Sequence, residues 1–434
     1  MPAAEGPPVR GFDYLIVGGG LAAVSAVDGI RELHPDASIA ILSDETEPPY
    51  QRPPLSKEFL QYPDVPRSLL YVKPEGWYDE QASLQLVTRQ KAMTLDPGAM
   101  RVTTARGTVY GAPRILLATG GRAKNLAVAG RDLPGVFTLR DVEDSEAIRA
   151  AGIEGTEAVL IGAGFVGMEL AASLSAHGVS STVVEALDRA WPRLLPPELA
   201  RWVAGYFEER GVSFRFNAAV EGFMGEERLE AVLAGGRSIP CDFAVVGVGM
   251  DPCDGLASDA GLAVDDGIQV DAFGETSHPH IYAAGDVARF PDPVFGGRTR
   301  VEHWEHAREH GRRVGRNMTG ERVPYDHLSH LFSRVFDLNV NVVGRPAAAS
   351  EIVRWGEPGE GPSVTFGLAE GRVSGVVLLD APAELEHART LVRSRAAANL
   401  VGDLATRDFG SLDGIARLAA ANAMEDQGIG EKYE

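Results

Sequence analysis

Cysteine is nearly absent from this sequence of 434 residues, which contains only Cys241 and Cys253. Two cysteines cannot build a disulfide framework, and their spacing does not form the C-x-x-C pair of a thiol redox motif. Long apolar runs are also missing, because no stretch approaches the roughly 18 residues that a membrane-spanning helix needs. We therefore expect no membrane-spanning segment and no membrane partner.

Basic charge is scarce relative to acidic charge, with 41 Lys and Arg against 61 Asp and Glu and a formal net charge of −20. This balance argues against nucleic acid and anionic membranes as partners. The opening segment, MPAAEGPPVRG, lacks the apolar core of a signal peptide, so we expect a cytoplasmic protein. The length of the chain predicts two or three domains.

A glycine-rich stretch in the middle of the chain has the pattern of a nucleotide-binding β-α-β unit. An apolar strand over residues 158–161 leads into Gly162-Ala163-Gly164-Phe165-Val166-Gly167, followed by a helix to about His177 and a strand over residues 182–184 that ends in Glu185. In such units the first glycine makes a tight turn, the second lets backbone approach a pyrophosphate, and the third allows close helix packing. The alternative is a glycine-rich turn of some other α/β domain, which the complete order of elements disfavours.

A second copy of this pattern opens the chain. A strand over Tyr14–Val17 leads into Gly18-Gly19-Gly20-Leu21-Ala22-Ala23, a helix to about Leu33, and a strand over residues 38–42. An acid after the second strand can accept hydrogen bonds from an adenosine ribose, and Asp44 or Glu45 fits, with Asp44 favoured by position. Two complete patterns in one chain predict two dinucleotides held by two domains.

Two further stretches offer polar groups on stiff backbone. Residues 49–57 read Pro49-Tyr50-Gln51-Arg52-Pro53-Pro54-Leu55-Ser56-Lys57, in which the prolines fix an extended entry and Ser56 is expected to cap a helix beginning at Lys57-Glu58. From these residues alone, Arg52 and Lys57 fit a solvated helix start. A buried strand over residues 114–118 ends in Thr119-Gly120-Gly121, a second place where backbone can approach a cofactor closely.

Five motifs in this order carry a family resemblance: G-G-G-x-A-A, P-Y-x-R-P-P-L-S-K, A-T-G-G, the central glycine-rich unit, and Tyr282-Ala283-Ala284-Gly285-Asp286. Over about residues 12–345 the sequence resembles the FAD-dependent pyridine-nucleotide oxidoreductases. It is most similar to the branch that holds the ferredoxin, rubredoxin and putidaredoxin reductases, apoptosis-inducing factor and monodehydroascorbate reductase.

The resemblance implies an α/β fold with two Rossmann-like domains of the glutathione-reductase type and a smaller α+β C-terminal domain. The expected domains are an FAD domain over residues 1–125 and 250–322, an NAD(H) domain over 126–249, and a C-terminal domain over 323–434. In the last of these, residues 363–368 and 373–379 are expected to form a hairpin and residues 383–399 a helix. A monomer or a homodimer is expected.

The resemblance also assigns residues to the FAD site. Carried over position by position, the FAD contacts are Gly18, Gly20, Ala23, Asp44 or Glu45, Arg52, Lys57, Ala92, Thr119, Gly120, Arg140 and Asp286. A helix to about Met318 is expected to begin near the flavin, with Glu302, His303 and Trp304 at the ring, and Phe332 is expected to cover the ring. His303, His306 and His310 lack a complete ligand set, so we expect no metal.

For NAD(H), the resemblance implies contacts from Gly162, Gly164, Phe165, Val166, Gly167, Glu185 and Gly249. Glu185 favours NADH over NADPH, because its carboxylate accepts from a 2′-hydroxyl and repels a 2′-phosphate. Arg189 and Arg193 would oppose this preference if they reached a phosphate. Lys57 and Glu169 form the implied catalytic pair beside the reactive nitrogen of the flavin, although an acid such as Glu169 is also favourable near any helix N-terminus.

No cysteine precedes Cys241, which excludes the disulfide-reductase and peroxidase branches that need a thiol beside the flavin. We therefore predict an FAD-dependent oxidoreductase that passes electrons from NADH to a small iron–sulfur protein such as ferredoxin or rubredoxin. The alternatives are a quinone or monodehydroascorbate reductase and an NADH-responsive sensor resembling apoptosis-inducing factor. Arg334 stands where many relatives have an acid, and this departure argues against ordinary ferredoxin-reductase specificity. Arg308, Arg312 and Arg316 share one helix face, either as a solvated face or as a docking strip for an acidic redox protein.

Overall fold

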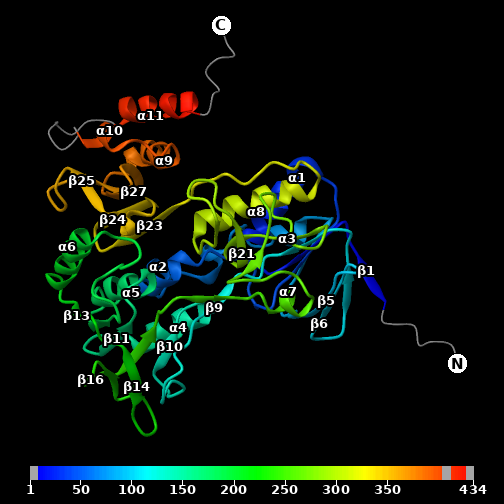
Figure 1. Cartoon of the computed structure of the whole chain (residues 1–434). Helices are drawn as coiled ribbons and strands as arrows, with labels where there is room; N and C mark the ends of the chain where they lie inside the picture. Colours follow the sequence, from blue (N-terminus) through cyan, green and yellow to red (C-terminus); the bar gives the residue numbers. More distant parts are fainter. Residues whose placement is uncertain (1–7, 403–411, 427–434) are drawn as a thin grey trace. The chain divides into compact units, whose positions relative to one another are not determined.

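The computed structural model of the chain describes residues 8–402 and 412–426 (Figure 1). Residues 1–7, which contain part of the opening segment from which a cytoplasmic protein was expected, lie outside the described residues, as do residues 403–411 and 427–434. The chain forms two compact units and passes repeatedly between them. Unit 1 comprises Met1–Pro53, Asp64–Arg122 and Met250–His327, and unit 2 comprises Pro54–Pro63, Ala123–Gly249 and Leu328–Glu434.

Unit 1 is built on a parallel five-stranded sheet in the order β20-β8-β2-β3-β4. Its strands are β20 (Ile281–Ala283), β8 (Ile115–Leu117), β2 (Tyr14–Val17), β3 (Ile39–Leu42) and β4 (Leu84–Val87). The three central strands are apolar and fully buried, as expected for parallel strands covered on both faces. This sheet confirms the predicted strand–helix–strand order at the start of the chain.

Helix α1 (Leu21–Leu33) packs closely against α8 (Trp304–Met318) in unit 1. Glycines make this approach possible: a Cβ on Gly311 would lie 2.3 Å from the carbonyl oxygen of Ala22, and one on Gly29 would lie 2.2 Å from that of Arg312. The helix that follows the first glycine-rich loop is therefore held directly by a helix nearly 300 positions later.

The remaining elements of unit 1 are shorter. One sheet, in the order β1-β7-β6-β5, contains β1 (Val9–Gly11), β7 (Val109–Gly111), β6 (Arg101–Thr104) and β5 (Ala92–Asp96). Another contains β19 (Ile268–Gln269), β21 (Ala288–Pro291) and β22 (Arg298–Thr299). The helical turns are η2 (Arg67–Leu70), α3 (Trp77–Glu80), α7 (Gly255–Asp259) and η3 (Gly285–Val287). Strands β9 (Gly121–Ala123) and β18 (Met250–Pro252) lie where the chain passes between units.

Unit 2 contains a second parallel five-stranded sheet, in the order β10-β17-β11-β12-β13. Its strands are β10 (Val136–Thr138), β17 (Phe243–Val246), β11 (Glu157–Ile161), β12 (Ser180–Val184) and β13 (Ser213–Arg215). Helix α5 (Phe165–Ser175) follows β11 directly, as the central glycine-rich pattern predicts. The two parallel sheets confirm the prediction of an α/β fold with two Rossmann-like units.

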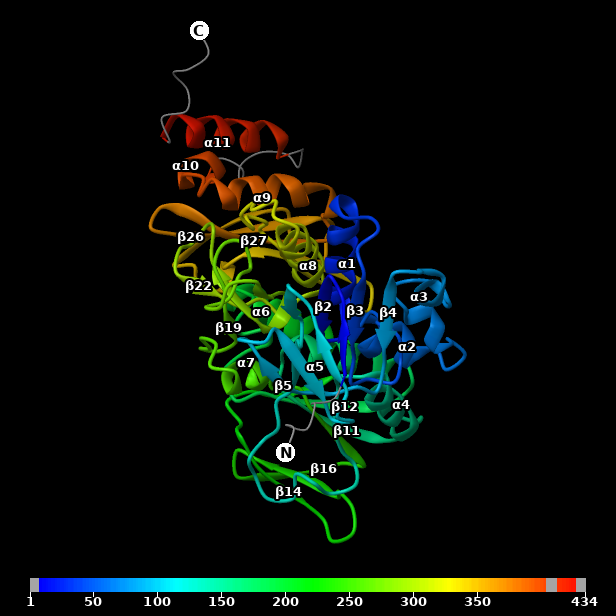
Figure 2. The same ribbon diagram turned by 90° about the vertical axis from the view of Figure 1, so that its right-hand side faces the viewer.

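The C-terminal part of unit 2 forms an antiparallel sheet in the order β23-β24-β27-β26-β25. Its strands are β23 (His330–Val335), β24 (Leu338–Gly344), β27 (Arg372–Leu379), β26 (Ser363–Ala369) and β25 (Glu351–Trp355). Strands β26 and β27 form the predicted hairpin. Helices α9 (Leu385–Arg393), α10 (Ala398–Gly402) and α11 (Asp413–Asp426) stack beyond this sheet, with α9 on β27 and α11 on α9 (Figure 2).

The prediction of one helix over residues 383–399 is wrong, because α9 ends at Arg393 and α10 begins at Ala398. Arg395 between them has a φ of +50°. The Val373 N–H donates to the Ala396 carbonyl over 2.8 Å, so this backbone pairs with the start of β27 instead of continuing the helix. Tertiary hydrogen bonds thus override a sequence with good helix propensity.

The other elements of unit 2 surround these sheets. The helices and helical turns are η1 (Pro53–Ser56, which begins at the last residue of a unit 1 segment), α2 (Glu58–Gln61), α4 (Val142–Ala151), α6 (Pro197–Glu208), η4 (Pro346–Ala348) and η5 (Pro382–Glu384). A three-stranded antiparallel sheet contains β14 (Val220–Met224), β15 (Ala231–Ala234) and β16 (Arg237–Pro240).

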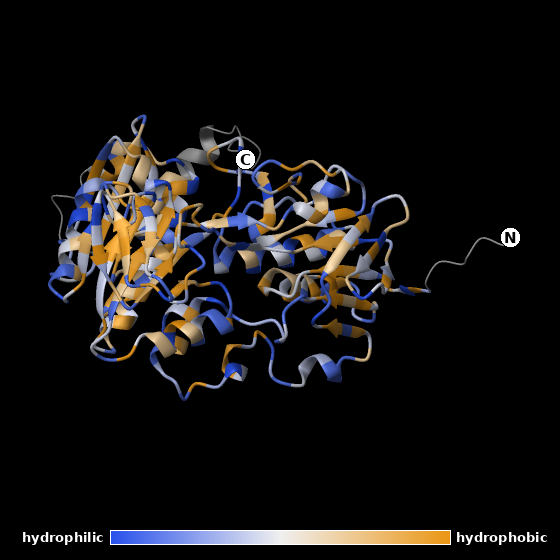
Figure 3. Ribbon diagram, turned by 90° about the horizontal axis from the view of Figure 1, so that it is seen from below, coloured by the Kyte–Doolittle hydropathy of each residue, from blue (hydrophilic) through white to orange (hydrophobic). Residues whose placement is uncertain are grey.

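The strands of the sheets are largely hydrophobic in Figure 3, whereas hydrophilic residues collect in helices and loops. In unit 2 one continuous core joins residues around α5, such as Leu170, to residues of the C-terminal sheet, such as Val340. The two compact units are defined by packing, and one of them contains residues of both the expected NAD(H) domain and the expected C-terminal domain. The predicted boundaries of the three functional domains therefore stay a prediction. Within the described residues, no helix combines the length and the apolar character needed to cross a membrane.

Candidate functional site

The first glycine-rich loop connects β2 to α1 in unit 1. Gly18 has a φ of +115°, and a Cβ there would lie 2.1 Å from the carbonyl oxygen of Ala118. Gly20 is the N-cap of α1, and no atom of the described residues lies within 4 Å of its Cβ position. The first N–H groups of α1 therefore face a space in which a phosphate group can approach the backbone closely.

Three of the motifs assigned to FAD meet at this loop. The Cβ position of Gly18 lies 3.0 Å from the backbone nitrogen of Thr119, and that of Gly285 lies 2.7 Å from the Cβ of Ala22. The Thr119 hydroxyl donates to the carbonyl of Cys253 over 2.7 Å. Unit 1 thus brings the G-G-G, A-T-G-G and A-A-G-D motifs together, although they are far apart in the sequence.

The acids after β3 have different partners. Glu45 accepts a hydrogen bond of 2.6 Å from the Tyr50 hydroxyl and forms an ion pair with Arg52. Burial is the largest effect and lowers the pKa of Arg52, but the charges of Glu45, Tyr50 and Asp286 and the hydrogen bond to Glu45 together raise that pKa overall. The side chain of Asp44 is exposed. Glu45 therefore holds Arg52 in place, and Asp44 is the more accessible acid for a ribose.

The structure shows that Asp44 is not the direct counterpart of Glu185. The N–H of Gly18 donates to the Leu42 carbonyl over 2.8 Å, and the N–H of Gly162 donates to the Val184 carbonyl over 2.7 Å. The residue after Leu42 is Ser43, which therefore occupies in unit 1 the position that Glu185 occupies in unit 2. A Cβ on Gly19 would lie 2.3 Å from the hydroxyl oxygen of Ser43, so this small side chain lies against the loop.

The other positions assigned to FAD in unit 1 are Ala23, Ala92, Gly120 and Asp286. Ala23 is fully buried in α1, and Ala92 begins β5 at a sheet edge. Gly120 has a φ of +61° and accepts from the Cys253 N–H over 2.9 Å. Asp286 lies in η3, and its carbonyl accepts from Arg300 over 3.2 Å.

The start of α8 carries the three residues expected at the flavin ring. His303 is the N-cap of α8, and Trp304 is its first residue. Arg308 lies over the Trp304 ring, 4.9 Å from its centroid. Glu302 forms an ion pair with Arg300, whose side chain is almost fully buried. The three residues thus lie next to each other at a helix N-terminus, where the helix dipole favours negative charge.

The histidines that follow on α8 have structural partners. His306 is 3.0 Å from the Tyr325 hydroxyl, and Nδ1 of His310 accepts from the Gly285 N–H over 3.3 Å. Both rings are fully buried and lie within 5.2 Å of the Phe290 ring centroid. Burial lowers the pKa of His306 and lowers that of His310 to about 3. No cluster of three or more metal-ligating side chains occurs in the described part of the chain.

We expect the neutral His310 to make stability fall below neutral pH. Its pKa is about 3 in the folded protein, against an ordinary histidine value of 6.5 in the unfolded chain, so the unfolded chain takes up the proton first as the pH falls. This group contributes its full stabilisation above pH 6.5, and lowering the pH from 7.5 to 5.5 should remove about 1.4 kcal/mol of it. Chemical unfolding of the unaltered protein and of His310→Gln at the two pH values measures this difference. Equal pH dependence in both proteins would contradict the assignment.

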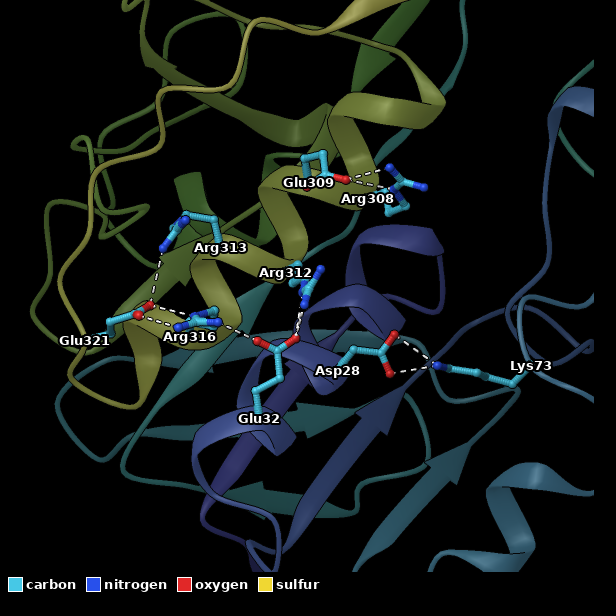
Figure 4. Close-up of polar contacts among 9 residues, drawn as sticks. All are labelled: Asp28, Glu32, Lys73, Arg308, Glu309, Arg312, Arg313, Arg316 and Glu321. Carbon is cyan, nitrogen blue, oxygen red and sulfur yellow. Dashed lines mark hydrogen bonds and ion pairs between the residues drawn. The ribbon is translucent and has the colours of Figure 1, made fainter.

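The predicted arginine strip on α8 is engaged by acids of unit 1 (Figure 4). Arg312 and Arg316 both pair with Glu32 of α1 at 2.6 Å, and Arg316 also pairs with Glu321 at 2.5 Å. Arg308 pairs with its neighbour Glu309 at 2.7 Å. Arg312 and Arg316 thus tie α8 to α1 through Glu32, whereas Arg308 pairs within its own helix, and the docking interpretation stays a prediction.

The second glycine-rich loop connects β11 to α5 in unit 2. Gly162 has a φ of +100°, and a Cβ there would lie 2.5 Å from the carbonyl oxygen of Gly247. A Cβ on Gly167 would lie 1.9 Å from the carbonyl oxygen of Gly162, so only glycine allows α5 to pack this closely. Gly164 is the N-cap of α5, and Phe165 and Val166 follow it, both partly exposed.

Glu185 is bound to the glycine-rich loop itself. One carboxylate oxygen accepts from the Ala163 N–H over 2.8 Å and the other from the Leu187 N–H over 2.9 Å. Because a carboxylate offers about four acceptor positions, ribose hydroxyls can still bind it. Arg189 donates to Asp188 at 2.8 Å and to a carbonyl, which directs its guanidinium toward protein acceptors.

Lys57 and Glu169, the two residues that the resemblance pairs, form an ion pair in unit 2 with 2.9 Å between Nζ and Oε1. Both side chains are largely buried, with exposed fractions of 14% and 8%. Glu169 also accepts from the hydroxyl of Ser56 and, over 2.6 Å, from that of Ser333. Ser56 therefore does not cap α2, whose N-cap is Lys57.

Three further predicted positions belong to unit 2. The N–H of Arg140 donates to Asp144 over 2.7 Å, just before α4. Phe332 lies in β23, with its ring centroid 5.4 Å from that of His330. Gly249 has a φ of +109°, and no described atom lies within 4 Å of its Cβ position. Gly249 is thus accessible, and the contacts of Arg140 and Phe332 with FAD stay a prediction.

Sequence reasoning missed Ser333 and the role of Ser56, because a serine hydroxyl gives no motif of its own. It also missed Arg215, whose carbonyl accepts from the Glu185 N–H over 2.9 Å and whose side chain is exposed beside the end of β12. A search for polar residues at the ends of all strands next to β12 would have found Arg215.

Two dinucleotide-binding folds with intact glycine loops define the class of this protein as an FAD-dependent NAD(P)H oxidoreductase. The fit to FAD depends on unit 1, where the glycine positions leave backbone N–H groups accessible and where a side chain would fill the space that a pyrophosphate needs.

Comparison with known proteins agrees with this class. Residues 12–311 match the pyridine nucleotide-disulphide oxidoreductase family, and residues 331–406 match the reductase C-terminal domain. The ferredoxin–NAD(+) reductase subunit of the benzene 1,2-dioxygenase system from Pseudomonas putida is 33% identical over 383 residues, covering 88% of this chain and 92% of that protein. Peroxisomal monodehydroascorbate reductase 1 from Oryza sativa subsp. japonica is 34% identical over 430 residues, covering 92% and 89%.

Among solved structures, a chain from the covalent putidaredoxin reductase–putidaredoxin complex matches with a TM-score of 0.88 and 29% identity. The match covers 95% of this chain and all of that chain. The chain therefore belongs to the pyridine nucleotide-disulphide oxidoreductase family, which confirms the resemblance seen in its motifs.

Proposed function

We propose that this protein takes hydride from NADH onto bound FAD and passes the electrons to a small iron–sulfur protein. FAD, when bound, supplies the redox chemistry. The protein residues bind and orient the two cofactors: the glycine loop of unit 1 for FAD and that of unit 2 for the nicotinamide nucleotide. The observation that carries the proposal is the buried Lys57–Glu169 ion pair. Removing two charges from water costs about as much free energy as their attraction returns, so a buried ion pair adds little to the stability of the fold and indicates a functional role.

Lys57 and Glu169 are proposed to act by position and field and not by proton transfer. Glu169 lies on α5, the helix whose N-terminus follows the nucleotide loop, so its carboxylate is fixed relative to Gly162 and Gly164. Lys57 is held at the end of a proline-rich segment, where the stiff backbone limits its movement. The ammonium group is thereby kept at one place beside the nucleotide-binding unit.

NADH is proposed as the reductant because Glu185 places a carboxylate at the strand end, where a 2′-phosphate of NADPH would lie. Two exposed arginines, Arg193 and Arg215, are the residues that oppose this preference. Neither arginine takes the place of Glu185, so we expect repulsion between the Glu185 carboxylate and a 2′-phosphate to outweigh attraction by the arginines.

We expect Glu185→Gln to reduce the preference for NADH over NADPH about tenfold in kcat/KM, since the charge that repels a 2′-phosphate is removed while the side-chain size is kept. Steady-state kinetics with both nucleotides at one ionic strength measures the ratio. Glu157→Gln, at the opposite end of the same sheet, is the control and should leave the ratio unchanged. An unchanged ratio in Glu185→Gln would remove the specificity role.

A small iron–sulfur protein is proposed as acceptor because the bacterial relative is a ferredoxin reductase and the solved structure is of a reductase joined to putidaredoxin. A small-molecule acceptor is the second candidate, since the rice relative is a monodehydroascorbate reductase and since Phe332 and Arg334 depart from the residues expected in ferredoxin reductases.

Stopped-flow spectroscopy tests both candidates. The flavin-loaded protein is reduced anaerobically with NADH and then mixed with ferredoxin, rubredoxin, a quinone or monodehydroascorbate. Reoxidation by an iron–sulfur protein much faster than by the small molecules supports the proposal. Faster reoxidation by a small molecule would favour the second candidate, and a flavin that NADH does not reduce would overturn both.

A further inference from the structure

The carboxylate of Glu169 is held by donors from three separate segments of unit 2. Lys57 Nζ donates to Oε1 over 2.9 Å, and the Ser56 hydroxyl donates to Oε2. The third donor is the Ser333 hydroxyl, which donates to Oε1 over 2.6 Å from strand β23, 164 positions later in the chain. Glu169 is only 6% exposed, so these donors replace most of the water that would otherwise solvate its charge.

The geometry of β23 fixes where this hydroxyl points. Side chains alternate along a strand, and Leu331 and Val335 pack into the core that contains residues of α5. Ser333, between them, faces the same way, whereas Phe332 faces the other side of the sheet. A shift of one residue would replace the hydroxyl with Phe332 or Arg334, so the contact depends on the register of the strand.

That register is held within the strand and just beyond its C-terminal end. Ser333 pairs with Val340 of β24 in the antiparallel ladder. Beyond the strand, Asp337 accepts a hydrogen bond from the hydroxyl of Tyr206 on α6, and Phe336 packs on Phe207 with 5.1 Å between ring centroids. The Ser333 hydroxyl is therefore presented to Glu169 by a rigid strand, and it is not a mobile surface group.

We propose that Ser333 is a positioning residue that fixes the Glu169 carboxylate, and with it the Lys57–Glu169 pair, in the orientation used for reduction of the flavin. This inference rests on the proposed function, because the pair matters for rate only if NADH reduces bound FAD. It assigns to the C-terminal sheet a part in the reductive reaction. Strand β23 thus presents Phe332 on one face and, on its other face, holds Glu169 of the nucleotide-binding helix α5 through Ser333.

A double-mutant cycle tests whether Ser333 acts through Glu169. We expect Ser333→Ala to lower the limiting rate of flavin reduction by NADH about tenfold, with little change in the apparent affinity for NADH. In a Glu169→Met background, which has no oxygen to accept from Ser333, the same substitution should change the rate less than about twofold. Ser333→Thr, which keeps the hydroxyl, should restore most of the rate.

The matched control is Ser374→Ala in β27. Ser374 is also a buried serine of the C-terminal sheet, but its hydroxyl donates to the Gly367 carbonyl over 3.0 Å. This variant should reduce flavin at the unaltered rate. If Ser333→Ala lowers the rate equally in both Glu169 backgrounds, Ser333 has a general structural role and the inference is overturned.

The same cycle measured by chemical unfolding of the flavin-loaded protein needs no NADH. The two substitutions should be non-additive in the unfolding equilibrium constant by about fivefold or more, since they remove the two ends of one buried hydrogen bond. Additive effects on unfolding overturn the inference. A flavin that NADH does not reduce in the unaltered protein overturns the proposed function instead, and the unfolding cycle then still decides whether Ser333 fixes Glu169.

Discussion

Lys57→Met is expected to slow the reduction of bound FAD by NADH about 100-fold, equivalent to about 3 kcal/mol in the barrier, while FAD remains bound. Methionine keeps the length of the side chain but removes the ammonium group that lies 2.9 Å from Glu169. Glu169 then keeps its charge in a buried place with only hydroxyl donors, so both its position and the local field change. Stopped-flow absorbance under anaerobic conditions gives the limiting rate, and flavin content gives the binding.

Two further variants separate the charge effect from general damage. Lys73→Met removes a similar lysine from a more exposed ion pair, with Asp28 at 2.7 Å in unit 1, and should leave the rate unchanged. Combining Lys57→Met with Glu169→Gln should recover stability, since no buried charge is left unpaired, without recovering the rate. A normal rate in Lys57→Met would show that the ion pair has no part in flavin reduction.

The glycine-rich units could be predicted from the sequence because their determinants are local. Gly162, Gly164 and Gly167 lie within six positions of one another, and the first and last of them are required by backbone conformation or by a close contact in the structure. The strands on either side are short apolar runs in fixed order. The local spacing of these residues was therefore enough to predict the fold class and both nucleotide-binding loops.

Interactions between distant segments could not be predicted in the same way. The arginines of α8 share one face by helical periodicity, yet their partner Glu32 lies 280 positions before Arg312, so the pattern alone could not distinguish a docking strip from an internal ion-pair network. The break between α9 and α10 likewise depends on pairing of Ala396 with β27. Ser333 is the same kind of case, since only the register of β23 brings it to Glu169.

A comparison of two glycines in the first loop is expected to separate folding from FAD binding. Gly18→Ala should destabilise unit 1 by about 3 kcal/mol or more, because alanine is strained at a φ of +115° and its Cβ would lie 2.1 Å from the Ala118 carbonyl oxygen. Gly20→Ala should change stability by less than about 0.5 kcal/mol, since its φ of −99° suits alanine and its Cβ position is open.

The two variants should differ most when flavin is measured. In Gly20→Ala the new methyl group occupies the space in which a pyrophosphate approaches the N-terminus of α1, so we expect FAD affinity to fall about 100-fold in a protein that remains folded. Circular dichroism during chemical unfolding of the apoprotein gives stability, and fluorescence of released flavin gives affinity. Full FAD affinity in Gly20→Ala would mean that the pyrophosphate does not lie at this loop. Equal stability of Gly18→Ala and the unaltered protein would mean that the loop adapts to a side chain, and the close contact with Ala118 would then not explain why glycine is needed at position 18.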